Sequence, residues 1–337
     1  MSTFTARSSK YAMMEVDEAL LSVIKETGTT RIVDVAVSKC IGLHLAEPVM
    51  AMADFPAAPV SMMDGYAVKV PLKAGVHRVQ SQIRAGDDDG KPLQADCVAY
   101  ITTGAVVPNG ADAVVKVEDT SATLGSSHSG SVTGNSARMD GEQEVNINVE
   151  VTQEMQNIRE IGSDIKSGEV VIKEGTVLGA VEIGLLATIG ITKVKCYQRP
   201  RVGVMSTGNE LVEADYEGKL EKGMIRDSNR AALLSAFGSE GYNLVDLGIA
   251  GDTLEALTAT FKEALQKCDV IITSGGVSMG DADLVKPLLE KLGKVHFGRI
   301  NMKPGKPTIF ATVNVTDVPG GKEEETEMRS VLIFGLP

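Results

Sequence analysis

The stretch VIITSGGVSMGDADLVKPLLEKL, residues 270–292, decides the fold. Residues 270–273 are an apolar run of strand length, and residues 281–292 carry apolar side chains at helical spacing. The paired glycines Gly275 and Gly276 lie in the loop between them. A strand, a glycine loop and a helix in this order are typical of an open α/β sheet, in which ligands bind beyond the carboxyl ends of the strands.

The same alternation continues through the C-terminal half of the chain. The strands are apolar without polar alternation, which predicts a parallel sheet covered on both faces. We therefore predict a doubly wound α/β domain at residues 199–337. Its helices are expected at 231–237, 253–266 and 281–292, and its strands at 202–205, 244–249, 270–273, 294–300, 308–312 and 331–334.

The N-terminal half follows a different pattern. Residues 16–24 repeat apolar side chains on one helical face. Residues 54–118 are rich in Gly, Pro and Val and predict short strands with turns. Residues 121–144 form a Ser- and Gly-rich polar tract, which predicts a mobile loop or insertion. The chain is thus predicted to be a multi-domain α/β protein with a β-rich insert.

The composition excludes several classes of function. The 45 acidic and 33 basic residues give a net charge of −12, which argues against a general nucleic-acid binder. The longest apolar stretch, residues 178–192, contains Glu182 and is too short for a membrane span. The N-terminus lacks a secretory signal, and the four cysteines are too far apart for a zinc site or a disulfide scaffold. We therefore expect a cytoplasmic protein.

The loop at residues 273–281 is the first candidate binding site. Its paired glycines let backbone N–H groups approach a ligand, and the start of the next helix adds partial positive charge. This suits a phosphate or the edge of a pterin. The loop matches neither a Walker A motif nor GxGxxG. The alternative interpretation is a tight turn, in which Asp283 only favours the helix dipole.

The second candidate is the basic loop KVHFGRINMKPGKP, residues 294–307. It holds four cations and no acid, although the rest of the chain is acidic. Lys303 and Lys306 each precede a proline, which favours extended backbone and stiffens the loop. Like charges this close repel one another unless an anion lies between them. The pattern favours a small oxyanion or phosphate site, and the alternative is a solvated basic loop.

A third feature is a set of acidic residues beside glycines or at helix starts. Each has an ordinary structural explanation: Asp227 and Asp252 suit helix N-caps, and Asp64-Gly65 suits a turn. Binding of a hard cation would require two or three of the carboxylates to converge. Without the signatures HExxH or GxSxG, the residues alone indicate an α/β enzyme for a phosphorylated or oxyanionic ligand. The set comprises Asp64, Asp164, Glu210, Asp227 and Asp252.

Nine motifs, in order along the chain, resemble the molybdopterin molybdotransferase family, which includes bacterial MoeA, the gephyrin E domain and the E domain of the plant molybdenum-insertion protein. Together they extend from about residue 13 to residue 337. They are SMMDGYAV (61–68), TTGAVVPNGADAVVKVED (102–119), GSDIKSGE (162–169), EIGLLATIGI (182–191), MSTGNEL (205–211), IRDSNR (225–230), LGIAGD (247–252), TSGGVSMGDADLVKPLL (273–289) and MKPGKP (302–307).

The resemblance implies insertion of molybdate into adenylylated molybdopterin with release of AMP, assisted by a divalent cation, usually Mg²⁺. It also implies the roles of individual residues. The metal ligands would be Glu210, Asp252 and Asp283. The catalytic positions would be Asp64, Asp164, Glu210, Asp252 and Asp283. The substrate-binding residues would be Thr103, Ser274, Gly275, Gly276, Ser278, Arg299, Lys303, Lys306 and Pro307.

The resemblance further implies an architecture. Residues 1–53 and 147–198 would form an elongated, discontinuous α+β domain I. Residues 54–146 would form a β-rich domain II, with the loop at 121–144, and residues 199–337 a MogA-like, molybdopterin-binding domain III. A fourth, β-barrel domain follows a Leu-Pro-Gly-Asn-Pro turn in the family. This chain ends at Leu336-Pro337, within that motif, so we expect a C-terminally truncated protein.

The implied partners are a second copy of the chain in a homodimer, a separate adenylyltransferase that supplies the substrate, and apo-molybdoenzymes that accept the product. Neither nucleic acid nor membrane insertion is expected. Two alternatives stay open. A gephyrin-like scaffold is disfavoured because Leu20 stands where gephyrin has an aromatic residue. A molybdopterin adenylyltransferase is disfavoured because Val277-Ser278 replaces the Thr-Gly of that family.

Overall fold

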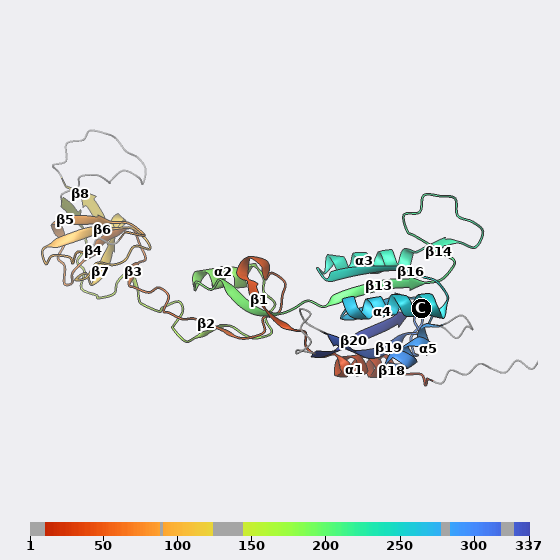
Figure 1. Cartoon of the computed structure of the whole chain (residues 1–337). Helices are drawn as coiled ribbons and strands as arrows, with labels where there is room; N and C mark the ends of the chain where they lie inside the picture. The colour runs from red at the N-terminus through yellow and green to blue at the C-terminus, as the bar shows by residue number, and fades with distance from the viewer. Residues whose placement is uncertain (1–10, 88–89, 124–143, 278–283, 318–326) are drawn as a thin grey trace, which may run out of the picture. The chain divides into compact units, whose positions relative to one another are not determined.

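The computed structural model (Figure 1) describes residues 11–87, 90–123, 144–277, 284–317 and 327–337. The chain forms two compact units. Met1–Val33 and Tyr197–Pro337 form the α/β unit, and Asp34–Cys196 form the β-rich unit. Of the helices within these described ranges, none has both the length and the apolar character needed to cross a membrane.

A six-stranded sheet is the centre of the α/β unit, and the predicted doubly wound arrangement is present (Figure 1). The strand β13 pairs in parallel with both β16 and β17, and β17 pairs in parallel with β20. The chain moves from β16 on one side of β13 to β17 on the other, which makes a switch point at this place. The strand order is β16 (Asn243–Ala250), β13 (Arg201–Thr207), β17 (Val270–Ser274), β20 (Glu327–Leu336), β19 (Ile309–Asp317) and β18 (Lys294–Phe297).

The expectation of a wholly parallel sheet is wrong at one strand. The strand β19 is antiparallel to both of its neighbours, β18 and β20. Its ladder with β20 runs from Ile309 opposite Gly335 to Asp317 opposite Glu327. The connecting residues 318–326 are fewer than the dozen or so that a parallel crossover needs, so consecutive strands here must form a hairpin. Both strands are also longer than the apolar runs that predicted them.

Helices cover both faces of this sheet. On one face, α4 (Leu254–Lys267) and α5 (Val285–Leu292) pack in a core that contains Phe261 and Ile271. On the other, α3 (Ser228–Ser239) packs against Val202 and Ile272. The predicted helices at 231–237 and 253–266 are confirmed: α3 is longer by three residues at its start and two at its end, and α4 is shifted by one residue. The predicted helix at 281–292 begins at Val285, and residues 281–283 lie outside the described ranges.

The N-terminal helix α1 (Val16–Glu26) confirms the helix predicted at 16–24. It packs within the α/β unit, where Ala19 belongs to a buried cluster with Phe297, Ile300 and Phe310. The resemblance instead assigned residues 1–53 to domain I, and the four-domain scheme remains a prediction. Only part of the apolar face of α1 is buried: Ala19 is buried, whereas Leu20 is exposed.

The β-rich unit contains a second six-stranded sheet, and the short strands predicted at 54–118 are confirmed. All of its pairings are antiparallel except that of β5 with β6. Part of the predicted loop at 121–144 is strand, because Ser121 and Ala122 pair with β9. Residues 124–143 lie outside the described ranges. The order is β7 (Ala113–Lys116), β4 (Gly65–Val68), β6 (Cys97–Ile101), β5 (Gly75–Ile83), β9 (Glu144–Ile147) and β8 (Thr120–Ala122).

The rest of this unit consists of two-stranded sheets and one helix, α2 (Ala180–Thr188). Glu182, which interrupts the apolar stretch, caps this helix: its Oε2 accepts a hydrogen bond from Gly179 N at 2.9 Å. The two-stranded sheets here are β1 (Ile32–Ala36) with β12 (Lys193–Tyr197), β2 (Val49–Met50) with β11 (Val170–Ile172), and β3 (Val60–Ser61) with β10 (Ile158–Arg159). The 3-10 helices are η1 (Val37–Lys39) and η2 (Val117–Asp119), and the α/β unit adds the pair β14 (Leu211–Val212) and β15 (Ile225–Arg226).

Candidate functional site

The candidate site is the edge of the α/β sheet where the parallel strands end. Ser206 near the end of β13 pairs with Ser274 at the end of β17, which in turn pairs with Leu336 of β20. The strand β18 runs parallel to β20, because each is antiparallel to β19, so the basic loop after β18 leaves from the same edge. The glycine loop, the basic loop and the segments after β13 and β16 therefore share one edge, the one at which ligands bind in such sheets.

The two glycines after β17 are required by close packing. Both have positive φ, +86° at Gly275 and +68° at Gly276. A Cβ at Gly275 would lie 2.6 Å from Thr207 O, and one at Gly276 would lie 2.7 Å from Thr207 Oγ1. Only glycine fits both the backbone angles and the space. The loop thus turns tightly against the end of β13. The predicted ligands Ser278 and Asp283 lie outside the described residues.

The end of β13 also carries an unusual hydroxyl group. The Oγ1 of Thr207 is buried and has no hydrogen-bond partner among the residues that the structure describes, and the same holds for Thr273 on β17. Buried hydroxyls are usually hydrogen-bonded, because an unpaired one costs free energy. Thr207 was not among the predicted site residues. Its place in the MSTGNEL motif was the available signal.

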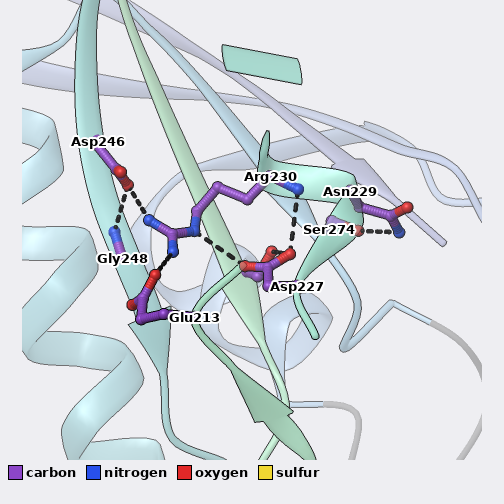
Figure 2. A network of polar contacts seen from close by, with 8 residues as sticks. Glu213, Asp227, Asn229, Arg230, Asp246, Gly248 and Ser274 are labelled. Carbon is purple, nitrogen blue, oxygen red and sulfur yellow. Dashed lines mark hydrogen bonds and ion pairs between the residues drawn. The ribbon is translucent and has the colours of Figure 1, made fainter. Parts of the chain in front are cut away.

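Ser274, a predicted substrate-binding residue, is oriented by the helix α3. Its side chain is buried, and its Oγ accepts a hydrogen bond from Asn229 Nδ2 at 2.9 Å (Figure 2). Asn229 lies in the first turn of α3 and is itself exposed. Its amide therefore reaches the sheet edge beside the glycine loop. Sequence reasoning missed this residue, although it belongs to the IRDSNR motif.

A buried arginine holds the start of α3 in place (Figure 2). Arg230 is only 5% exposed, and its guanidinium contacts three carboxylates, those of Asp227, Asp246 and Glu213. Burial lowers the pKa of Arg230, but the hydrogen bonds to these carboxylates outweigh it, so the pKa lies above its ordinary value. The group is therefore a permanent charge that ties α3 to β16 and to the segment after β13.

Asp227 confirms its predicted role as a helix N-cap. Its Oδ1 accepts hydrogen bonds from Arg230 N at 3.1 Å and from Ser206 Oγ at 3.0 Å. Its Oδ2 accepts from Arg230 Nε at 2.9 Å. With only 2% of its surface exposed, Asp227 is thus fully satisfied inside the protein. It supports the site and is not free to bind a ligand.

The N-cap interpretation of Asp252 is wrong. The helix α4 is capped by Thr253, whose Oγ1 accepts from Ala256 N at 3.2 Å. Asp252 instead joins two loops of the sheet edge: its Oδ2 accepts from Asn209 N at 2.9 Å, and its own N–H donates to Asn209 Oδ1 at 3.2 Å. This reciprocal pair places Asp252 against the residue that precedes Glu210.

Glu210 and Asp252 are two of the three predicted metal ligands. Oxygen donors of this kind suit a hard cation such as Mg²⁺. Glu210 lies on the exposed side of the loop, where its carboxylate folds back over Gly208. Within the described ranges, no group of three His, Cys, Asp or Glu side chains is arranged to hold a metal. The third predicted ligand, Asp283, lies outside those ranges, so the cation site stays a prediction.

The basic loop presents its cations to solvent. Lys303 and Lys306 are exposed, and Arg299 is half-buried. In the part of the chain that the structure describes, only Lys294 of the four cations pairs with a carboxylate, that of Glu26 at 3.8 Å. Arg299, Lys303 and Lys306 are therefore the cations of the loop that pair with no carboxylate among the described residues.

Asp64 and Thr103, two predicted site residues, meet in the β-rich unit. The Oδ1 of Asp64 accepts hydrogen bonds from both Thr103 N at 2.6 Å and Thr103 Oγ1 at 2.9 Å. Both residues are exposed. The next residue, Gly65, begins β4 instead of completing a turn. Glycine is required there, because a Cβ would lie 1.8 Å from Val115 O of the neighbouring strand.

Asp164 is engaged in a different contact of the β-rich unit. Its Oδ2 pairs with Arg159 Nη1 at 3.1 Å, and its Oδ1 accepts from Ser163 Oγ at 3.3 Å. The pair is exposed on both sides. An exposed ion pair contributes little stability, so the arrangement leaves the functional assignment of Asp164 as a prediction.

The fold and site define an α/β protein with a glycine loop and a basic loop at the ligand-binding edge of its sheet, combined with a β-rich unit. Comparison with known families specifies the class. Residues 14–190 match the MoeA N-terminal region (domain I and II), and residues 203–337 match a probable molybdopterin binding domain. The chain belongs to the MoeA family of molybdopterin molybdenumtransferases.

Individual relatives agree with this assignment. Gephyrin from Dictyostelium discoideum is 40% identical over 91% of this chain and 44% of its own length. The molybdopterin molybdenumtransferase of Haemophilus influenzae is 37% identical over 79% of this chain and 61% of its own length. That of Staphylococcus aureus (strain COL) is 31% identical, over 89% and 68% respectively. The chain thus spans about half to two thirds of these relatives.

A solved structure confirms the fold. The molybdopterin biosynthesis MoeA protein of Pyrococcus horikoshii superimposes with a TM-score of 0.73 at 30% identity. The match covers 97% of this chain and 75% of that protein. The predicted combination of a MogA-like α/β domain with a β-rich domain and an α+β domain is therefore confirmed as a fold.

Proposed function

We propose that the protein is a molybdopterin molybdotransferase, which inserts molybdate into adenylylated molybdopterin and releases AMP during molybdenum cofactor biosynthesis. The observation that carries the proposal is the exposed cationic loop at the ligand edge of the α/β sheet, in a chain with a net charge of −12. The names of the relatives support the same activity. Fold alone would not, because one fold hosts many functions.

The proposed division of labour follows the chemistry of the residues. Molybdate is a small dianion and binds between Lys303 and Lys306, with Arg299 beside them. The pterin and its phosphate bind along the glycine loop, where Ser274 and the backbone N–H of Gly276 are donors. Gly275 lets the ligand approach closely, while its own N–H donates to Leu336 O at 3.0 Å. The reaction needs charge neutralisation and alignment of the reactants more than a protein nucleophile.

The proposed cation is Mg²⁺, held by Glu210, Asp252 and Asp283. When bound, it polarises the phosphoanhydride that is cleaved. The reciprocal hydrogen bonds between Asp252 and Asn209 hold the first two of these carboxylates on neighbouring loops of the sheet edge. Each contributes negative charge, which keeps the cation beside the anionic substrate.

The direct test is AMP release by the intact protein that contains this chain. Purified protein is mixed with adenylylated molybdopterin, with and without molybdate and with and without Mg²⁺, and AMP is quantified. We expect release only when molybdate and the divalent cation are both present. AMP release at the same rate without molybdate would refute the proposal.

Asp283→Asn is expected to slow AMP release by about ten- to a hundredfold, because it removes the charge of a proposed metal ligand and keeps its size. If the residue only favoured the helix dipole, the effect would be about 0.3–1 kcal/mol of stability and no loss of turnover. Single-turnover AMP release and thermal unfolding distinguish the two. The matched control is Asp215→Asn, an exposed acid in the same unit, which should turn over normally.

Asp64→Asn is expected to reduce turnover by about tenfold, because Oδ1 can still accept from Thr103 while the carboxylate charge is lost. The free energy of unfolding should change by less than about 1 kcal/mol, since the pair is exposed. Asp96→Asn, another exposed acid of the β-rich unit, is the control. A variant that turns over like the control would assign Asp64 to local structure only.

Three partners accompany the proposed activity. The protein forms a homodimer, receives its substrate from a separate molybdopterin adenylyltransferase, and passes its product to apo-molybdoenzymes. Its proposed location is the cytoplasm, and the four free cysteines are all buried thiols, consistent with a reducing compartment. Light scattering of the intact protein tests the dimer, and a monomer mass would remove that part of the proposal.

A further inference from the structure

The N-terminal segment Tyr11–Glu15 runs alongside the first half of the basic loop. Met14 N donates a hydrogen bond to Arg299 O at 3.2 Å, and Asn301 N donates to Met14 O at 2.7 Å. Met14 and Ile300 thereby form a parallel β-bridge. The backbone on both sides of Ile300 is thus attached to a segment almost 300 residues away in the sequence.

Side chains extend this attachment in both directions. Glu15 Oε1 accepts a hydrogen bond from Asn301 Nδ2 at 2.9 Å. At the other end, Tyr11 packs on Gly298, where a Cβ would lie 2.9 Å from the ring, and its hydroxyl donates to Glu290 of α5. The ammonium group of Lys286 lies 5.4 Å from the centre of the Tyr11 ring. The segment therefore fixes the backbone on both sides of Arg299.

The second half of the loop is fixed by its own hydrogen bonds. Ile300 N donates to Lys306 O at 2.9 Å, and both N and Oγ1 of Thr308 bond to Gly305 O, at 3.2 and 2.6 Å. The backbone around Ile300 therefore joins the two sets of contacts. Met14 is hydrogen-bonded to Arg299 and Asn301, the residues on either side of Ile300, and Ile300 itself is hydrogen-bonded to Lys306. A shift of the N-terminal segment would move the backbone of Lys306 with Ile300.

We infer that Tyr11–Glu15 is a positioning segment for the oxyanion loop, and that Glu15, acting through Asn301, is a positioning residue for Lys303 and Lys306. Two exposed lysines bind a small anion well only if their ammonium groups are held at a suitable separation, because ordering them on binding costs free energy. Glu15 contacts the amide of Asn301, so its effect reaches the anion only through the loop backbone. The inference rests on the proposed function in taking molybdate as the anion.

The test compares four single variants of the intact protein and the double variant Glu15→Ala with Asn301→Ala. Glu15→Ala and Asn301→Ala each remove one partner of the hydrogen bond. Glu15→Gln keeps the accepting oxygen and serves as the rescue variant. Glu18→Ala, an exposed acid on the first turn of α1, is the control for loss of charge. Glu15 is at the N-cap position of α1 but makes no side-chain capping bond, so its removal leaves the helix itself intact.

Two measurements are made on each variant. The first is the molybdate concentration that gives half-maximal AMP release, together with the rate at saturating molybdate. We expect Glu15→Ala and Asn301→Ala to raise the half-saturating concentration by about five- to tenfold with little change in the saturated rate. Glu15→Gln and Glu18→Ala should behave like the parent protein. The double variant should match the singles, because both act through one contact.

The second measurement is hydrogen exchange of the amides at residues 299–306 without substrate. We expect faster exchange in Glu15→Ala and Asn301→Ala. In Glu18→Ala the exchange rates should equal those of the parent protein. Unchanged exchange and unchanged half-saturation in folded variants would overturn the inference. If exchange is faster in these variants but AMP release does not depend on molybdate, the positioning segment is retained and molybdate is rejected as the anion. Failure of the positioning inference can therefore be distinguished from failure of the proposed function.

Discussion

Replacing Arg230 by methionine is expected to lower the free energy of unfolding by about 3–5 kcal/mol. Methionine fills a similar volume, so the loss comes from charge. Asp227, which is almost fully buried, would keep its hydrogen bonds from Ser206 and from the backbone but lose the guanidinium that neutralises it. An uncompensated buried carboxylate is one of the costliest single defects in a protein.

Urea unfolding at pH 7, followed by a probe in the α/β unit, measures this effect. The matched control is Glu213→Gln, which removes a partner that is 56% exposed and should cost no more than about 1 kcal/mol. If Arg230→Met lost as little as this control, the guanidinium would not be compensating a buried charge. The predicted asymmetry between the buried and the exposed partner would then be wrong.

The second large effect is expected for Lys303→Ala combined with Lys306→Ala. Each lysine contributes a charge-assisted contact worth about 1.5–3 kcal/mol, so the half-saturating molybdate concentration should rise by about two to four orders of magnitude. Binding of the adenylylated pterin should change far less, because we propose the glycine loop as the site of those contacts. Titration of AMP release with molybdate, and calorimetry with the pterin substrate, separate the two.

The control for this pair removes the same charge elsewhere. Lys262 on α4 and Lys291 on α5 are both exposed, and Lys262→Ala with Lys291→Ala lowers the net charge equally. A similar rise in this control would mean that the overall electrostatic field attracts molybdate. No rise in the Lys303 and Lys306 variant would exclude the basic loop as the oxyanion site.

The sequence was most informative where local chemistry decides structure. An apolar run followed by two glycines predicted β17 and its loop. The prediction succeeded because the loop requires glycine at 275 and 276, where φ is positive and Thr207 lies too close for a Cβ. The basic loop was visible from composition alone. The direction of β19 was not predicted correctly. An apolar run indicates a strand, but it does not indicate which strand it pairs with or whether the pairing is parallel or antiparallel. The short connection at 318–326 was the better guide.

The supporting contacts of the site were harder to foresee. Arg230 directly precedes the helix predicted at 231–237, and its carboxylate partners lie 3, 16 and 17 residues away: at the N-cap of α3, on β16 and in the loop after β14. Asp252 was read as a cap because it precedes a helix, but Thr253 is adjacent and competes for that role. Such choices depend on which groups the fold brings together, and local sequence patterns do not show this.

The place of α1 in the α/β unit has a consequence for the synthesis of the protein. The segment Tyr11–Glu15, just before α1, contacts residues 279 and 286 positions further along the chain, so these contacts cannot form until Glu290 and Asn301 have left the ribosome. The β-rich unit, by contrast, is continuous from Asp34 to Cys196 and can fold while the rest is still being made. The helix α1 therefore emerges long before Phe297 and Phe310, with which it forms a buried cluster. Until then its apolar residues, such as Ala19 and Val23, are open to chaperones or to premature association.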